Sequence, residues 1–346
     1  MVMSYQNPHA PITPMDEDVA QNEDIENENR RKMAAMITSL DYGVGRITSA
    51  LEKTHQLNNT IIIFLSDNGG HLMMPSGESL GSSNLPFRGA KCTLYEGGVR
   101  TPAFIKIPHL ITPGQVNSSV KYDGLFHISD WFPTIVSLAQ LDPRLLKKEL
   151  QFQDDKKPYL DGIDHSETFK QLLDETQKAE APRDHVVLDI DPVFNQAAII
   201  KGKYKLIVGK AAFMDFDQVY PLIDDNSIQN EDIVVNASYY KISPNISQQM
   251  RAYAETQTKY AADPLKCLNL DCMTKDKLLF DLSWDVTESN DLSWRFSAET
   301  DELYETLRTY SNRNHKPVEP KFFEDQNEEA KKDDVWTPWL LNSTEV

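Results

Sequence analysis

Apolar residues between positions 29 and 53 recur every three or four positions, which is the spacing of one face of a helix. These positions are Met33, Met36, Ile37, Leu40, Val44, Ile47 and Leu51. Gly43 and Gly45 weaken a helix but allow close packing on a neighbouring element. The pattern predicts a long amphipathic helix over residues 29–53 that packs on a sheet.

A short run of β-branched and aromatic residues follows at positions 60–65, and it stops at Asp67-Asn68-Gly69-Gly70. The run is too short for a membrane span and is typical of a strand buried on both faces. Asp67 and Asn68 would then lie at the carboxyl end of a buried strand, where open α/β sheets bind ligands. Both offer the hard oxygen atoms that Ca²⁺ or Mg²⁺ prefers. The alternative is an ordinary turn, because Asn and Gly favour turns.

Further elements follow from the same kind of pattern. A helix starting at Ser129 or Asp130 has Pro133 in its first turn and runs to about residue 141. Additional helices are predicted at residues 166–176 and 298–312, the latter with an acidic first turn that suits the helix dipole. Strands are predicted at residues 103–107, 186–188, 197–200, 204–208 and 278–282, with a hairpin turn at residues 201–203. A charged linker at residues 177–184 divides the chain into domains of residues 1–180 and 181–346.

Two more segments complete a pattern with the Asp-Asn-Gly-Gly turn. Residues 84–102 contain Arg-Gly-Ala-Lys followed by Glu-Gly-Gly-Val-Arg, and upstream lies Asn7-Pro8-His9-Ala10-Pro11. Together these segments resemble the sulfatase family, most closely its arylsulfatase B type (N-acetylgalactosamine-4-sulfatase). Smaller markers continue the resemblance in family order, at residues 126–134, 191–192, 201–206, 279–282, 290–293 and 335–339.

The resemblance implies an α/β, alkaline-phosphatase-like sulfatase fold and a sulfuric ester hydrolase activity. Residues 1–180 would form the C-terminal part of the catalytic domain, an incomplete mixed sheet with flanking helices. Residues 181–346 would form a smaller α+β domain with an antiparallel sheet. The expected partners are sulfated small molecules or glycosaminoglycans.

The resemblance also implies roles for individual residues. In the family a formylglycine hydrate attacks sulfur while one divalent cation, usually Ca²⁺, neutralises sulfate oxygens. Asp67 and Asn68 would supply half of the metal shell, and Lys91 would contact the sulfate and the leaving oxygen. His9 would contact the sulfate and help to protonate the departing oxygen. The alternatives remain open: Lys91 is a solvated surface lysine, and His9 is a turn histidine between two prolines.

Residues beside these positions receive different expectations. Arg88, Glu96 and Arg100 are expected to be structural and to form ion pairs that hold the loop of Lys91. His71 either lines the mouth of the substrate site or has no part in it. Trp336 and Trp339 are expected to dock the C-terminal tail.

Two family features do not occur in the sequence: the Cys/Ser-x-Pro-Ser-Arg motif that yields formylglycine, and an early strand ending in Asp-Asp with further metal ligands. Met1 to Tyr5 would fall inside a central strand of the family fold. The resemblance therefore implies the C-terminal portion of a sulfatase, inactive alone. The alternative is a non-catalytic product that binds sulfated glycans or a partner. A two-metal phosphatase of the same superfamily would need a His-rich pattern that the sequence does not contain.

Charge and cysteine content add constraints on partners and compartment. The formal net charge of -18 argues against a nucleic-acid surface and means that a polyanionic substrate needs a local Lys/His pocket. Cys267 and Cys272 are read as a local disulfide, with two free thiols as the alternative, and Cys92 is left over. Five glycosylation sequons occur, at Asn58, Asn117, Asn236, Asn245 and Asn342. With no signal peptide or membrane span in the sequence, sequons favour a truncated lysosomal or secreted protein.

Overall fold

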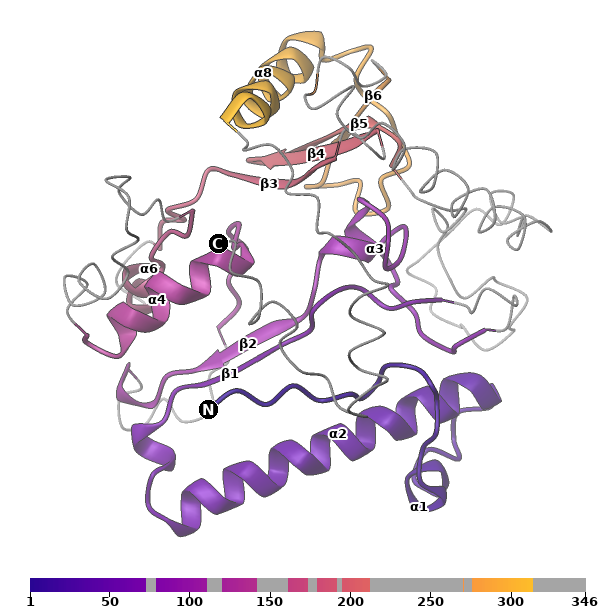
Figure 1. Cartoon of the computed structure of the whole chain (residues 1–346), viewed down its shortest axis with the longest axis vertical. Coiled ribbons are helices and arrows are strands. Elements are labelled where there is room, and N and C mark those ends of the chain that lie inside the picture. The colour runs from indigo at the N-terminus through magenta and orange to yellow at the C-terminus, as the bar shows by residue number, and fades with distance from the viewer. Residues whose placement is uncertain are drawn as a thin grey trace, which may run out of the picture.

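The computed structural model describes residues 1–72, 79–110, 120–141, 161–173, 179–191, 195–211, 270 and 276–313. Its main elements form three groups: a long helix, a two-stranded ribbon above it, and a four-stranded sheet covered by a helix (Figure 1). Short helices connect the groups. Their bounds are α1 (Asp16–Ala20), η1 (Leu57–Asn59), α3 (Glu96–Val99), η2 (Pro108–Leu110), η3 (Ile128–Asp130), α4 (Trp131–Leu138) and α6 (Ser166–Leu173).

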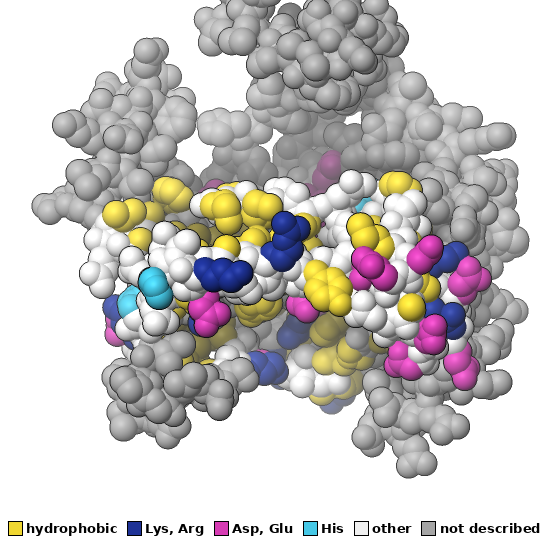
Figure 2. Space-filling view, turned by 90° about the horizontal axis from the view of Figure 1, so that it is seen from below, with side chains coloured by type: hydrophobic (Ala, Val, Ile, Leu, Met, Phe, Trp, Pro, Cys, Tyr) yellow, Lys and Arg dark blue, Asp and Glu magenta, His cyan; other side chains and the backbone are white. Residues whose placement is uncertain are grey.

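The long helix is α2 (Glu28–Lys53), and it confirms the helix predicted at residues 29–53. Asn27 caps it, because its side chain accepts a hydrogen bond from the backbone N–H of Arg30 at 3.0 Å. The apolar face is buried at Met33 and Met36 and only partly covered further along. From below, hydrophobic side chains lie between charged ones, and acidic side chains gather at the end formed by α1 and the start of α2 (Figure 2).

The ribbon consists of β1 (Ile62–Leu65) and β2 (Ala103–Lys106), which pair antiparallel. The rings of Phe64 and Phe104 stack at 5.1 Å between centroids. The prediction that this strand is buried on both faces is wrong for the described residues, because Leu65 is exposed and the rest of β1 is half-buried. No third strand pairs with the ribbon within the described part of the chain, so the outer edges of β1 and β2 lack a ladder partner there.

The expectation that Met1 to Tyr5 lie in a strand is also wrong. This segment makes no ladder with the described strands, and the side chains of Met1 and Val2 are almost fully exposed. Contact with α2 begins at the end of this segment, where the ring of Tyr5 lies beside Gly43, and the amide of Asn7 donates to the backbone oxygen of Met36 at 2.9 Å. A strand forms only where a neighbour supplies backbone hydrogen bonds, and none of the described strands does so here.

The C-terminal sheet is antiparallel, in the order β3-β4-β5-β6, and confirms the predicted strands and the hairpin turn. Helix α8 (Ser297–Arg313) covers one face and confirms the helix predicted at residues 298–312. The other face packs against Leu94 and Tyr95. The strands are β3 (His185–Asp191), β4 (Gln196–Lys201), β5 (Tyr204–Gly209) and β6 (Lys277–Asp281).

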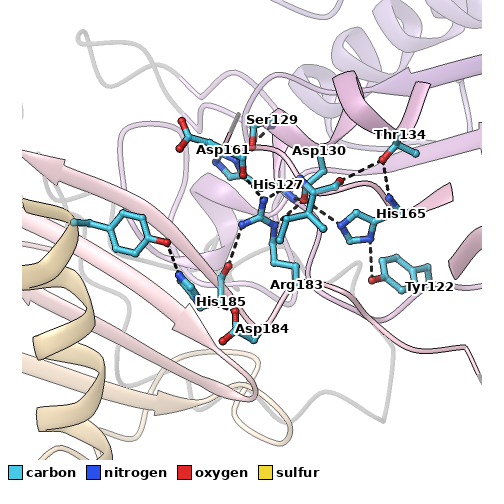
Figure 3. A network of polar contacts seen from close by, with 12 residues as sticks. Tyr122, His127, Ser129, Asp130, Thr134, Asp161, His165, Arg183, Asp184 and His185 are labelled. Carbon is cyan, nitrogen blue, oxygen red and sulfur yellow. Dashed lines mark hydrogen bonds and ion pairs between the residues drawn. The ribbon is translucent and has the colours of Figure 1, made fainter. Parts of the chain in front are cut away.

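A buried polar network joins α4 to the approach to β3 (Figure 3). The carboxylate of Asp130 accepts hydrogen bonds from the backbone N–H of His127 at 2.8 Å and of Ile163 at 2.7 Å. It also pairs with both arms of the Arg183 guanidinium and lies 3.2 Å from Nε2 of His165. Burial by itself raises the pKa of Asp130, but the hydrogen bonds from His165, Arg183 and the backbone together hold it well below its usual range.

The predicted helix at residues 129–141 is therefore present in a modified form. It begins as the short helix η3 and continues as α4, which ends at Leu138. Asp130 acts as an acceptor for the N–H of His127, the residue before η3, as a capping side chain does. The helix predicted at residues 166–176 is α6, and its last three predicted residues lie outside the described part.

Candidate functional site

The turn after β1 presents two oxygen-bearing side chains. Asp67 is exposed, and its Oδ1 accepts the backbone N–H of Asn68 at 2.9 Å. The Nδ2 of Asn68 donates to the backbone oxygen of Gly69 at 2.8 Å. This hydrogen bond turns the amide nitrogen of Asn68 inward and leaves its Oδ1 available to a ligand. The carboxylate and the amide oxygen thus emerge from adjacent residues at the end of one strand.

The segment that contains Lys91, residues 88–98, packs directly against this turn. The backbone N–H of Gly69 donates to the oxygen of Gly98 at 2.9 Å, and the N–H of Lys91 donates to the oxygen of Gly70 at 3.2 Å. A Cβ at Gly69 would lie 1.8 Å from the backbone oxygen of Gly97, so only glycine permits this approach. A Cβ at Gly97 or Gly98 would also meet backbone oxygens, here within the same segment, whereas a Cβ at Gly70 would lie 3.1 Å from the side chains of Ser82 and Asn84.

The Asn84 side chain ties the same region together. It accepts the N–H of Gly70 at 2.7 Å and donates to the oxygens of Gly70 and Gly89. One amide therefore holds the end of the β1 turn and the start of the Lys91 segment in register. Asn84 is the first residue of the motif at residues 84–102, but the sequence alone predicts no role for it.

Three basic side chains act on one another beside this turn. Burial lowers the pKa of His71, and the positive charges of Lys91 and His9 lower it further. Lys91 is half-buried, whereas His9 is exposed. The Nδ1 of His9 lies 2.7 Å from the backbone oxygen of Ala10, and the peptide bonds before Pro8 and Pro11 are cis. Residues separated by more than 80 positions therefore contribute charge to the same place.

The donor set agrees with part of a divalent cation shell. Asp67 and Asn68 offer one charged and one neutral oxygen, the kind of ligand that Ca²⁺ or Mg²⁺ takes. Ca²⁺ takes six to eight oxygens, so two residues do not complete its shell. Among the described residues, no group of three or more His, Cys, Asp and Glu side chains could hold a metal ion.

One ion pair expected around the Lys91 loop is present, between Glu96 and Arg100. Glu96 is buried, and its carboxylate lies 3.5 Å from Nη1 of Arg100. The Arg88 guanidinium lies over the ring of Tyr95 at 4.2 Å. Sequence reasoning missed two further residues in this arrangement, Lys205 and Glu288, which come from the C-terminal sheet and from the segment after it.

Several other predictions fall outside the described residues. These are the Cys267–Cys272 disulfide, the sequons at Asn117, Asn236, Asn245 and Asn342, and the docking of Trp336 and Trp339. Asn58 lies exposed in η1, which is compatible with a glycan, and Cys92 is an exposed free thiol. No helix in the described ranges has the length and apolar character needed to cross a membrane.

Residues 1–141 match the sulfatase family model. Over these residues the chain is similar to the sulfatase family. The matched region contains the turn of Asp67 and Asn68, the Lys91 segment and His9. The family assignment predicted from the motifs is thereby confirmed, whereas the arylsulfatase B type within it is a finer assignment.

Curated sulfatases are similar over longer or shorter stretches. Arylsulfatase J of Mus musculus is 31% identical over 256 residues, which cover 68% of this chain and 38% of that protein. Human N-acetylgalactosamine-6-sulfatase is 34% identical over 135 residues, 39% of this chain and 23% of that protein. The chain thus spans well under two thirds of the length of the curated relatives it matches.

A solved structure is similar to this chain in architecture. Ps i-CgsB, in complex with k-i-k-neocarrahexaose, superposes with a TM-score of 0.55 at 21% identity and covers 95% of this chain and 53% of that one. This likeness confirms the predicted alkaline-phosphatase-like sulfatase fold with a C-terminal antiparallel sheet. The division into domains of residues 1–180 and 181–346 stays a prediction.

Proposed function

We propose that this protein is a sulfuric ester hydrolase of the sulfatase family that acts on sulfate esters of sugars. The observation that carries the proposal is the contact between the turn of Asp67 and Asn68 and the segment of Lys91. It places an oxygen pair suited to a cation next to a basic cluster suited to a sulfate group. The overall net charge of -18 makes a local basic cluster more significant for an anionic substrate.

Each residue has a role in this proposal. A divalent cation, Ca²⁺ by family resemblance, would be held in part by Asp67 and Asn68 and would neutralise charge on the sulfate oxygens. The ammonium of Lys91 binds the sulfate and stabilises the negative charge that develops on the leaving oxygen. The Nδ1 of His9 faces the backbone oxygen of Ala10. Its Nε2 is therefore the nitrogen that delivers a proton to the leaving oxygen of the substrate. Burial and the charges of Lys91 and His9 lower the pKa of His71, which favours its neutral imidazole.

The finer assignments belong to the same proposal. The motifs favour an N-acetylgalactosamine-4-sulfatase type and therefore a glycosaminoglycan or a sulfated small molecule as substrate. The relatives include an N-acetylgalactosamine-6-sulfatase, a name that also refers to a sulfated amino sugar. A lysosomal or secreted glycoprotein agrees with this substrate class and with an exposed Asn58 sequon.

A second candidate function rests on one sequence observation. The motif that yields the formylglycine nucleophile does not occur among the 346 residues. Removal of a nucleophile normally costs orders of magnitude in rate. We therefore propose that the chain as given binds sulfated ligands without turning them over, and that catalysis needs a nucleophile supplied from elsewhere.

Ligand binding and turnover can be measured separately on the purified chain. Inorganic sulfate is titrated in the presence of CaCl₂ by NMR, and p-nitrophenyl sulfate is used for turnover. Lys91→Ala should weaken sulfate binding by about 10- to 100-fold, the range expected for loss of a charged hydrogen-bond donor. Lys106→Ala is the matched control, because this exposed lysine lies at the far end of β2.

The outcomes distinguish the two candidates. Sulfate binding that depends on Lys91 but not Lys106, without turnover, supports the proposal for this chain. Calcium-dependent turnover abolished by Asp67→Ala would show that the chain supplies its own nucleophile. Equal sulfate affinity of the wild type and Lys91→Ala would overturn the site assignment.

A further inference from the structure

A fully buried lysine on the C-terminal sheet faces the back of the Lys91 segment. Lys205 of β5 has no exposed surface. Its Nζ lies 2.9 Å from Oε1 of Glu96 and 2.8 Å from Oε1 of Glu288, and both of these carboxylates are buried. Lysine is almost never fully buried unless it is paired, and Lys205 is paired with two carboxylates.

Glu288 extends the cluster to both ends of the Lys91 segment. Its Oε2 accepts the backbone N–H of Glu96 at 2.5 Å. Its own backbone oxygen accepts a hydrogen bond from Nη1 of Arg88 at 2.8 Å. A residue 190 or more positions away in the chain therefore holds the residues on either side of Lys91.

One backbone step connects this cluster to the candidate site. Glu96 begins α3, and it is followed by Gly97 and Gly98. The N–H of Gly97 donates to the backbone oxygen of Arg88, at the start of the Lys91 segment, at 2.7 Å. The oxygen of Gly98 accepts the N–H of Gly69, the residue after Asn68. A shift of Glu96 would therefore reach the turn of Asp67 and Asn68 as well as Lys91.

The charges explain why a cation is needed at this point. Burial raises the pKa of Glu288, and the neighbouring Glu96 charge raises it too, whereas Lys205 acts in the opposite direction. Without Lys205, two buried carboxylates would face each other with no buried ammonium between them. Removing one partner of a buried ion pair leaves an uncompensated charge, which is strongly unfavourable.

We propose that Lys205 is a positioning residue of the candidate site, which fixes the Lys91 segment and the Asp67–Asn68 turn through Glu96 and Glu288. The consequence for sulfate binding rests on the proposed function; the positioning itself does not. The C-terminal sheet then acts on the site through Lys205.

The test compares Lys205→Met with Lys203→Met. Both lysines lie in the β4–β5 hairpin region, but Lys203 is exposed and pairs with Asp281 at 2.6 Å. Sulfate affinity is measured by NMR with CaCl₂ present, and amide exchange is followed at Gly69, Lys91 and Gly97. Lys205→Met should lower sulfate affinity by about tenfold or more, since small misplacements of functional groups cost that much. Exchange should accelerate at the three site amides and stay slow in β4.

Glu288→Gln provides a second variant that leaves the side-chain size nearly unchanged. One of its two acceptors becomes a donor, so it loses either the Lys205 or the Glu96 contact. It should show a smaller change in the same direction. If Lys205→Met does not fold, this variant decides the matter by the same two measurements.

Each result counts for or against the positioning role. Wild-type sulfate affinity in Lys205→Met and Glu288→Gln would overturn it, and so would a uniform loss of amide protection with unchanged affinity. If the wild type itself binds no sulfate, the proposed function fails, while amide exchange still decides the positioning role. Unchanged exchange at Gly69, Lys91 and Gly97 would then overturn it.

Discussion

The C-terminal sheet and the β1–β2 ribbon differ sharply in how completely they are packed. The sheet has apolar residues with essentially no exposed surface on both faces, against α8 and against Leu94 and Tyr95. In the ribbon, Phe104 is 54% exposed and Leu65 is exposed as well. The candidate ligands of the cation and sulfate lie at the end of the less packed region.

This difference suggests how the site can be ordered. Apolar burial supplies most of the stability of a domain, so the ribbon alone has little to hold its turn in place. The Gly69–Gly98 and Lys91–Gly70 contacts attach the turn to α3, and Lys205 attaches α3 to the sheet. The order of the site therefore depends on the better-packed region.

The largest effect is expected beside the sheet, at the buried carboxylate of Asp130, which joins α4 to the approach to β3. Asp130→Asn leaves the Arg183 guanidinium without its charged partner, and loss of one partner of a buried pair costs about 3–5 kcal/mol. Urea denaturation measures the change. The matched control is Asp161→Asn, because Arg183 contacts only the backbone oxygen of Asp161, whose side chain is exposed.

The destabilisation caused by Asp130→Asn should also depend on pH. The pKa of Asp130 in the folded protein lies below its value in the unfolded chain, so its contribution is fully present above about pH 4. It is lost as pH falls through the folded-state pKa. The stability gap between wild type and Asp130→Asn should therefore narrow in acid. A gap that is constant from neutral pH to pH 3 would contradict the ionised assignment.

A second contrast compares the two regions directly. Leu307 of α8 has no exposed surface, and Leu307→Ala should cost about 2–5 kcal/mol through lost burial and a cavity. Phe104→Ala in β2 should cost about 1 kcal/mol, mainly the stacking on Phe64. Both are measured by chemical denaturation of the same preparation. Equal costs would show that the ribbon face is covered in solution and would remove the contrast.

Local sequence patterns predicted most of the elements, because each pattern reports the side chains of one segment. Helix α2 and the strands β4 and β5 carry clear helical or strand periodicity, and the sequence predicts all three within a few residues. The burial of β1 was mispredicted, since burial depends on which other elements cover a strand. An apolar run does not contain that information.

The site shows the same limit. Family motifs pointed to Asp67, Asn68, Lys91 and His9, because these residues sit in short recognisable segments. Lys205 lies in the marker at residues 201–206, whereas Glu288 lies between two markers, and neither position carries a chemical signal of its own. A lysine in an apolar strand, next to Leu206, is the one hint that such a position needs a buried acidic partner.

The smallest effect concerns the start of α2, a helix whose apolar face is only partly covered beyond Met36. Asn27 satisfies the N–H of Arg30, one of the backbone donors that a helix end leaves without an internal partner. Asn27→Ala should cost about 1 kcal/mol, the usual value for loss of such a cap. Asn29→Ala, two residues later and inside the helix, is the control and should be neutral or slightly stabilising, because Ala favours the helix. Denaturation followed by circular dichroism measures both. If Asn27→Ala is silent, the hydrogen bond from the N–H of Arg30 to Asn27 does not stabilise α2.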